Sequence, residues 1–329
     1  MIILCYKHET KINEREKSKK LMLKEWNGKR YHSLNYFLRN KFGEKVFKIS
    51  LDGGFSCPNR DGTISKGGCV FCSERGSGDF AGDRYTSIHK QFEDIKIMMN
   101  KKWKNGKYIA YFQAYTNTYA PVEVLKEKYY EALKEEDVVA LAIATRPDCL
   151  PDEVLDLLEE INEKFYVWVE LGLQTVNDDI ALKINRGYKL KVFEEAIEKL
   201  KKRNIDFVVH SILGLPGENK ADMLKTIDYI AHSGARGIKF HLLHLMKDTP
   251  MVKLYENGEL KFLSQEDYID LICKGIAMLP QDMVVHRLTG DAPRNLLIGP
   301  MWSLKKWEIL NAIDKALEEN DIYQGKDFK

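Results

Sequence analysis

The residues best suited to chemistry are three cysteines in one glycine-rich stretch, Cys57, Cys69 and Cys72. Their spacing is Cys-x11-Cys-x2-Cys, and no further cysteine or histidine lies close to them in the chain. A closed structural zinc site uses four protein ligands. Three thiols therefore favour a metal centre that keeps one coordination position open for another molecule. The two-residue spacer between Cys69 and Cys72 lets both thiolates reach one metal or cluster, so the first hypothesis is an enzyme.

A zinc site is the alternative, and it needs a distant fourth ligand, for which the candidates are Cys149, His210 and His241. The chain has six cysteines in 329 residues, which is not a disulfide framework. In a reducing compartment, clustered thiols favour metal binding. The remaining cysteines, Cys5, Cys149 and Cys273, are isolated, and each is expected to be a plain residue or a buried thiol. Cys149 is the exception to watch, because it follows residues 145–148 at the predicted active end of the third strand.

The elements that must position these cysteines alternate regularly from residue 46 onward. Short β-branched or aromatic runs predict strands over 46–51, 108–115, 138–145, 165–173, 207–213 and 238–245. Longer amphipathic stretches predict helices over 87–104, 122–134, 152–162, 190–203 and 221–233. Beyond residue 260, helices are expected over 265–279 and 304–317, on either side of one more short run at 283–288. This order indicates a parallel sheet with right-handed crossovers, and the apolar runs are typical of strands covered on both faces.

Six βα units fit either an open doubly wound sheet or an incomplete barrel. We favour the barrel, because polar or glycine-rich segments recur at the carboxyl ends of the strands, and that end of an α/β barrel holds the active site. The cysteine loop follows the first strand and falls at the same end. The other residues expected there are Gln113, Thr116, Asn117, Arg146, Glu170, Gln174, Gly214, Leu215, His241 and His244.

Composition and charge set the protein's class. The chain is 44% hydrophobic and 30% charged, as in soluble globular proteins, and no apolar run reaches the length of a membrane span or a signal peptide. We therefore expect a cytoplasmic protein without a membrane partner. Residues 1–48 contain 13 Lys and Arg and only 5 Asp and Glu, although the whole chain carries only +2. We expect a basic N-terminal arm over 1–45, a barrel over 46–260 and a C-terminal helical extension over 261–329; the arm is either a polyanion-binding element or a solvated extension.

The cysteine triad, with Phe71 just before its last member, resembles the cluster loop of radical S-adenosylmethionine (SAM) enzymes, whose common spacing is Cys-x3-Cys-x2-Cys. The longer first spacer is similar to that of the branch containing the Elongator catalytic subunit. A closer resemblance is to the YhcC/YtqA family of bacterial and archaeal radical SAM proteins, and it runs from about residue 29 to 307. The segments that carry it are GGFSCPNRDG (53–62), SGDF (77–80), QAYTNTY (113–119), TRPD (145–148), ELGLQ (170–174), GLPGE (214–218) and RLTGDAP (287–293).

The resemblance implies a partial (β/α)6 TIM-like barrel, a [4Fe–4S] cluster held by the three cysteines, and SAM on the open iron. One electron, from a donor such as flavodoxin or ferredoxin, would cleave SAM to methionine and a 5′-deoxyadenosyl radical that takes hydrogen from the substrate.

The resemblance also implies roles for individual residues. Phe71 would pack near the adenine, or else is a simple core aromatic. Gln113, Thr116 and Asn117 stand where such enzymes usually carry a Gly-Gly-Glu-like segment that contacts the methionine amino group. Glu170 and Gln174 would reach the ribose or the carboxylate. Arg146 would pair with the carboxylate, or else with Asp148. The turn at Gly214 and Leu215 would let the backbone approach the adenine. His210, His241 and His244 are either substrate-side groups or structural residues.

The likeness to Elongator, and the association of some family members with maturation of the aminomethyl side chain of wobble uridine, imply that tRNA is the substrate. The basic arm and Lys305–Lys306 agree with phosphate binding. Two alternatives stay open, a radical SAM enzyme acting on a small metabolite and a metal-stabilised, non-catalytic RNA-binding protein. The catalytic residues, reaction outcome, electron donor and oligomeric state are not determined by the sequence.

Overall fold

The computed structural model describes residues 26–101 and 106–329. The greater part of the expected basic arm, residues 1–25, lies outside the described residues. Within the described part, none of the helices has both the length and the apolar character needed to span a membrane.

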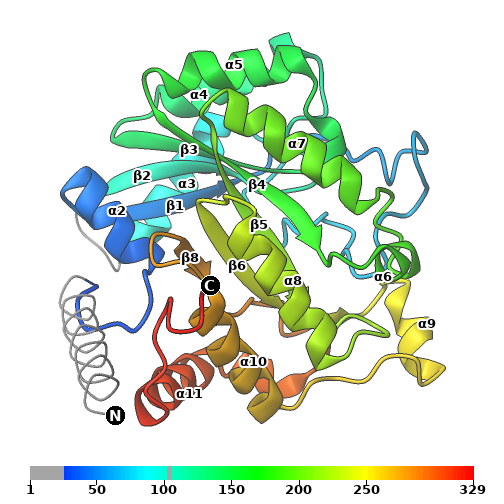
Figure 1. The fold of residues 1–329 in the computed structure, drawn as a ribbon. Helices are drawn as coiled ribbons and strands as arrows, with labels where there is room; N and C mark the ends of the chain where they lie inside the picture. The colour runs from blue at the N-terminus through cyan, green and yellow to red at the C-terminus, as the bar shows by residue number, and fades with distance from the viewer. Residues whose placement is uncertain (1–25, 102–105) are drawn as a thin grey trace.

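A curled sheet of seven parallel strands forms the centre of the molecule (Figure 1). Neighbouring strands follow one another in the chain, with β1 and β8 at the two edges. The strands, in sheet order, are β1 (Val46–Leu51), β2 (Lys107–Phe112), β3 (Val138–Thr145), β4 (Tyr166–Gln174), β5 (Asp206–Leu213), β6 (Gly237–Leu242) and β8 (Val284–Arg287). The predicted α/β partial barrel is thus confirmed. Its sheet gains a seventh strand from the short run near residue 285.

The main helices pack on the outer face of this sheet (Figure 1). The helix α5 (Asp152–Asn162) shows why: Val154, Leu155, Leu158 and Ile161 recur at helical spacing and are all buried. The helices of this layer are α3 (Ile88–Asn100), α4 (Val122–Leu133), α5 (Asp152–Asn162), α7 (Leu190–Lys202), α8 (Lys220–His232), α10 (Gln265–Met278) and α11 (Lys306–Glu319). Short elements complete the loops: η1 (Pro147–Cys149), α6 (Asp178–Lys183), β7 (Leu245–Met246), α9 (Met251–Glu256), β9 (Leu297–Gly299) and η2 (Met301–Leu304).

The inner face of the sheet is closed at one end by α2 (Leu34–Phe42), which contacts the two edge strands β1 and β8. Ser33 caps this helix and also forms a parallel bridge with Val285 of β8. Leu38 of α2 is buried against inward-facing residues of the middle strands, among them Ile109, Ala140 and Trp168. Residues 26–45 therefore pack on the barrel. The division into three units at residues 45 and 260 stays a prediction.

Two strands end earlier than predicted. The second ends at Phe112 instead of residue 115, because Tyr115 takes a positive φ of 61°. The sixth ends at Leu242, and Leu245–Met246 instead pairs antiparallel with Leu297–Gly299. The polar residues that follow these strands consequently lie in loops at the open end of the barrel, away from the α2 plug.

Candidate radical SAM site

The cysteine loop leaves β1 at the open end of the barrel and folds into a compact hairpin. The backbone N–H of Arg60 donates to Cys57 O at 2.8 Å, Gly68 N–H donates to Asn59 O at 2.8 Å, and Cys72 N–H donates to Cys69 O at 3.0 Å. Gly68 has a φ of 84°, and a Cβ there would lie 2.8 Å from Arg60 Nε. Only glycine tolerates both the positive φ and this close approach without strain.

The loop that follows β4 anchors this hairpin through two asparagines. Asn59 is fully buried and donates from Nδ2 to Asn185 O at 2.7 Å. Asn185 returns the contact, donating from Nδ2 to Gly68 O at 2.8 Å and to Ser65 Oγ at 3.2 Å. A backbone hydrogen bond of 3.0 Å from Val70 to Ile184 O adds to the attachment. The position of the cysteines is thus set by a segment more than a hundred residues away in sequence.

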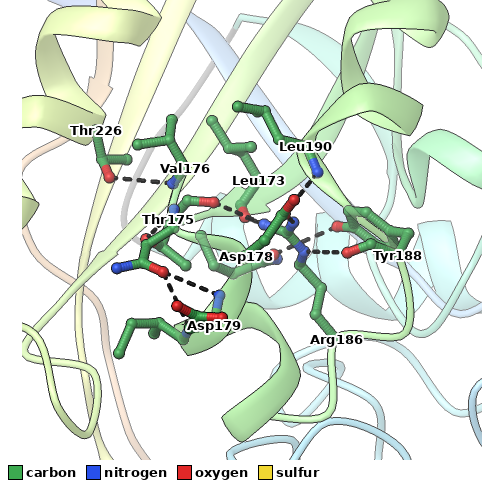
Figure 2. A network of polar contacts seen from close by, with 12 residues as sticks. Leu173, Thr175, Val176, Asp178, Asp179, Arg186, Tyr188, Leu190 and Thr226 are labelled. Atoms are coloured by element: carbon green, nitrogen blue, oxygen red, sulfur yellow. Dashed lines mark hydrogen bonds and ion pairs between the residues drawn. The ribbon is translucent and has the colours of Figure 1, made fainter.

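The anchoring loop is itself held by Arg186, which is 1% exposed. Figure 2 shows its guanidinium among the carbonyls at the end of β4: Nη1 donates to Leu173 O at 2.5 Å and to Thr175 O at 2.6 Å. Nη2 lies 3.4 Å from the carboxylate of Asp178, whose Oδ1 also accepts from the backbone N–H of Leu190 at 2.8 Å. Arg186 thus donates to two carbonyls at the end of the strand, one of which, Leu173 O, also accepts from the backbone N–H of Thr175 at 2.8 Å. Neither Arg186 nor the adjacent Tyr188 was predicted to contribute to the site.

All three cysteines line one cavity of about 740 Å³ at the open end of the barrel, a volume typical of small-molecule sites. Their thiols are free, and Cys69 Sγ accepts a weak hydrogen bond from Asn59 Nδ2 at 3.6 Å. Burial, followed by the neighbouring thiols of Cys72 and Cys57, raises the pKa of Cys69 to about 12. Burial also raises the pKa of Cys72, and Arg60 opposes that rise.

These thiols fit a thiolate-ligated cluster. They come from one loop and face one cavity, and Cys57 and Cys72 lie near enough to raise the pKa of Cys69. Binding to a metal replaces the protons of such thiols. Among residues 26–101 and 106–329, no three His, Cys, Asp or Glu side chains are already gathered as for a single metal ion. Cys149, a proposed fourth zinc ligand, is buried with Sγ 3.7 Å from Asp148 Oδ1 and is not among the residues that line this cavity.

Nine of the other predicted site residues join the cysteines in the lining of the cavity. They are Phe71, Gln113, Thr116, Arg146, Glu170, Gln174, His210, His241 and His244. Gln113 Nε2 donates to Ser77 O at 2.8 Å, so its amide oxygen is left for a ligand. Gln174 Oε1 lies 3.3 Å from the Tyr188 hydroxyl. The backbone of Gln174 has a φ of 62°, so the regular alternation of the strand expected after Glu170 does not extend to this residue.

Three predicted residues do not line the cavity. Asn117 is fully buried and donates from Nδ2 to Phe112 O at 3.1 Å and Ala144 O at 2.8 Å, so it fastens β2 to β3. Leu215 is 2% exposed and lies in an apolar cluster with Phe71 packed against it. Gly214 has a φ of 93°, and a Cβ on it would meet Leu263 at 3.3 Å. This turn therefore supports the cysteine loop through the packing of Phe71 against the cluster that contains Leu215.

Arg146 takes the second of its two expected arrangements. Nε and Nη2 donate to the Asp148 carboxylate at 2.9 and 2.7 Å, and Nη1 donates to Arg186 O at 2.8 Å. Through these three hydrogen bonds, Arg146 joins the loop after β3 to the loop after β4. Its bidentate pair with Asp148 fixes the wall of the cavity.

Glu170, which is predicted to reach the cofactor, lines the cavity and lies at the centre of an ion-pair network on the inner face of the sheet. It is fully buried, with Lys48 Nζ 3.0 Å from Oε1 and His210 Nε2 3.1 Å from Oε2. Lys239 Nζ is in direct contact with Oε2. Burial alone would raise the pKa of Glu170, but Lys239 and Lys48 hold it well below its usual range. Trp168 Nε1 donates to Oε1 at 3.1 Å, so the carboxylate has several partners.

Lys48 and Lys239 were not predicted as site residues, although both interrupt apolar strand sequences. Such an interruption was the available signal, because a lone charge in a buried strand needs a partner. The histidines beside them are neutral near pH 7. Burial and then Lys239 lower the pKa of His210 to about 4, and burial lowers that of His244 to about 4. His210 and His241 lie with ring centroids 4.9 Å apart.

A parallel partial barrel with a three-thiol loop over its open end, above a polar interior, is an arrangement suited to an enzyme that uses a metal cluster. The Radical SAM superfamily model matches residues 60–230, and the Radical_SAM C-terminal domain model matches residues 235–319. The chain therefore belongs to the radical SAM superfamily of enzymes.

Individual relatives agree with this assignment. The chain is 58% identical to the uncharacterized protein YtqA of Bacillus subtilis, over 92% of this chain and 94% of that protein. It is 40% identical to protein YhcC of Escherichia coli, over 87% of this chain and 91% of that protein. Elongator complex protein 3 of Bos taurus is 27% identical over 51% of this chain and 32% of that protein. The resemblance inferred from the motifs is thereby confirmed.

A solved structure, the archaeal Elp3 of Methanocaldococcus infernus with an N-terminal deletion, has the same fold. It aligns with a TM-score of 0.64 at 15% identity, over 85% of this chain and 64% of that one. This chain therefore spans just under two thirds of the archaeal protein.

Proposed function

We propose that this protein binds a [4Fe–4S] cluster through Cys57, Cys69 and Cys72, binds SAM beside it, and modifies the side chain of wobble uridine in tRNA. The observation that carries the proposal is the common placement of the three thiols on one cavity at the open end of a radical SAM barrel. When bound, the cluster and SAM together supply a 5′-deoxyadenosyl radical from one electron, delivered by a donor such as flavodoxin or ferredoxin.

The residues of this chain prepare that site. Because burial raises the pKa values of Cys69 and Cys72, their thiols stay protonated until a metal displaces the protons. The hydrogen bonds that Asn59 and Asn185 make between the two loops hold the cysteine loop over the barrel. Phe71 in this loop offers an apolar wall for the adenine. Gln113 and Thr116 face the same cavity and offer polar groups to the methionine end of SAM.

The mouth of the cavity supports an RNA substrate. Phe80 lines the cavity with 57% of its surface exposed. Arg60 and Tyr115 also line the cavity, and the Arg60 guanidinium lies 5.7 Å from the ring centroid of Tyr115. The guanidinium of Arg84, which is not a lining residue, lies 5.1 Å from the same ring. Exposed aromatic rings and arginines are the groups on which single-stranded bases stack. Lys305 and Lys306 do not add to this support, because they pair with Glu308 at 3.0 Å and Asp291 at 2.5 Å.

Nucleoside profiling of tRNA tests the proposal. A deletion strain is expected to show one altered wobble uridine, which the wild-type gene and a Cys273→Ala control restore and Cys69→Ala does not. Cys273 is a suitable control because it is a buried thiol on α10, outside the cavity. An unchanged nucleoside profile, together with no salt-sensitive binding of bulk tRNA, would exclude the tRNA substrate and leave a small metabolite.

The radical chemistry is tested separately by anaerobic reconstitution. Iron uptake followed by release of 5′-deoxyadenosine, on adding dithionite and SAM, is the expected result. Uptake of zinc with no 5′-deoxyadenosine would instead indicate a metal-stabilised, non-catalytic protein.

A further inference from the structure

The interior of the barrel, beneath the cysteine loop, carries more positive than negative charge. Glu170 is the carboxylate at its centre, and it is shared by two lysines, Lys48 and Lys239. The side chain of Lys239 is 6% exposed, so water reaches this ammonium poorly, while Lys48 is 22% exposed toward the cavity. One carboxylate between two lysines leaves one positive charge without an anion.

A third cation, Arg287 of β8, extends this excess. Its Nη2 lies 3.8 Å from Asp291, beyond normal hydrogen-bond distance. Asp291 is also engaged by Lys306 at 2.5 Å. Lys48, Lys239 and Arg287 all line the cavity, and together they exceed the negative charge that Glu170 and a shared Asp291 provide.

The cations act on one another. Burial lowers the pKa of Lys239, Glu170 opposes this effect, and Lys48 and Arg287 lower the pKa further. Bringing cations together in a poorly solvated space costs free energy unless an anion joins them. A bound anion would relieve this repulsion.

Neutral hydrogen-bonding groups surround the same space. His241 and His286 line the cavity, and each has a buried ring nitrogen without a hydrogen-bond partner, Nε2 and Nδ1 respectively. The Tyr111 hydroxyl lies 3.1 Å from Lys239 Nζ, and the Tyr111 ring lies 4.7 Å from Lys48 Nζ. A polar ligand entering from the mouth would thus meet cations and unpartnered ring nitrogens.

We propose that this interior, lined by Lys48, Lys239 and Arg287, is an anion subsite that receives a carboxylate or phosphate group of the substrate. The inference rests on the proposed function, since it takes the substrate into the cavity that the three thiols line. Binding there would hold the substrate by its charged group and leave its neighbouring carbon atoms between the subsite and the thiols.

Anion binding to the anaerobically reconstituted protein tests this subsite without tRNA or turnover. Sodium phosphate and sodium acetate are titrated separately, with chloride keeping the ionic strength constant, while calorimetry and thermal unfolding are recorded. Saturable stabilisation by phosphate alone or by acetate alone identifies the source of the charge. Lys48→Met is expected to weaken that binding by about tenfold or more, the loss typical of one charge-assisted hydrogen bond.

Matched variants separate the subsite from general charge effects. Lys126→Met removes an exposed lysine of α4 that pairs with Glu160 at 2.8 Å, and it should leave anion binding unchanged. Glu170→Gln removes the protein's own carboxylate, which competes with an added anion for Lys48 and Lys239, so it should tighten anion binding. If Lys48→Met fails to fold, Arg287→Met serves, because the side chain of Arg287 is 36% exposed and that of Lys48 is 22% exposed.

Three results would overturn the subsite: no saturable effect of either anion, equal weakening in Lys126→Met, or competition by SAM. Competition by SAM would assign the interior to the carboxylate of the cofactor. Because the titration uses no RNA, failure of the tRNA assay and failure of the subsite are distinguishable.

Discussion

Replacing Glu170 by glutamine probes the electrostatics of the barrel interior most directly. Trp168 Nε1 donates to Glu170 Oε1 at 3.1 Å, and glutamine keeps an oxygen that can accept this hydrogen bond. Glutamine removes the negative charge that pairs with Lys239 and Lys48. Removing one partner of a buried ion pair typically costs about 3–5 kcal/mol, because the other charge is left buried. Lys239 meets this condition at 6% exposure, whereas Lys48, at 22%, can turn toward water. We therefore expect a loss of about 3 kcal/mol in the free energy of unfolding, at the lower end of that range.

Urea unfolding of the cluster-free wild type and variants, followed by far-UV circular dichroism, measures this loss. The double variant Glu170→Gln/Lys239→Met supplies the control, because methionine fills a similar volume without charge. It should recover most of the lost stability, since a buried pair replaced by apolar groups is often neutral. The reasoning would be refuted if Glu170→Gln had the unfolding free energy of the wild type. It would also be refuted if the double variant lost as much stability as Glu170→Gln and Lys239→Met lose when their separate losses are added.

Three further predictions concern the cysteine loop and the loop after β5. Cys69→Ala should abolish iron loading, measured as iron per chain, and leave the circular dichroism spectrum unchanged, because the loop lies outside the core; global unfolding would contradict this. Asn185→Ala removes the hydrogen bonds to Gly68 O and Ser65 Oγ, so it should lower iron loading and cost about 1–2 kcal/mol in urea unfolding; full loading would show that the anchor is dispensable. Glu218 has buried carboxyl oxygens without partners, and burial raises its pKa to about 7. The folded state therefore holds a proton that the unfolded state releases, and stability should fall as pH rises from about 4.5 to about 7. Glu218→Gln should raise the unfolding free energy at pH 8 by about 1–3 kcal/mol and change it little at pH 4; equal effects at both pH values would contradict the assignment.

Much of the fold was predictable because its signals are local. The helix at 152–162 matches the prediction at both ends, and the strand at 138–145 does as well. Hydrophobic periodicity, helix-start signals and the alternation of elements need no long-range information. The end of the second strand was missed because Tyr115 turns at a positive φ that no proline or glycine announces.

The site was predictable only in part. The cysteines, Gln113 and Thr116 do line the cavity, since residues following parallel strands gather at one end of a barrel. The side chain of Asn117, next to Thr116, instead donates hydrogen bonds to backbone carbonyls of β2 and β3. A difference of one residue in a loop changes the direction of a side chain, and composition does not reveal that direction.

By itself, the sequence determined the three-thiol loop and the order of the βα units, because both depend on residue type and short spacing. Tertiary structure alone decided which charges meet. Lys48, Glu170 and Lys239 come from β1, β4 and β6 and converge because the sheet curls and turns alternate residues of each strand inward. In the sequence these are single charges in apolar runs, separated by up to 191 positions. Only the curling of the sheet brings them into one buried network beneath the cysteine loop.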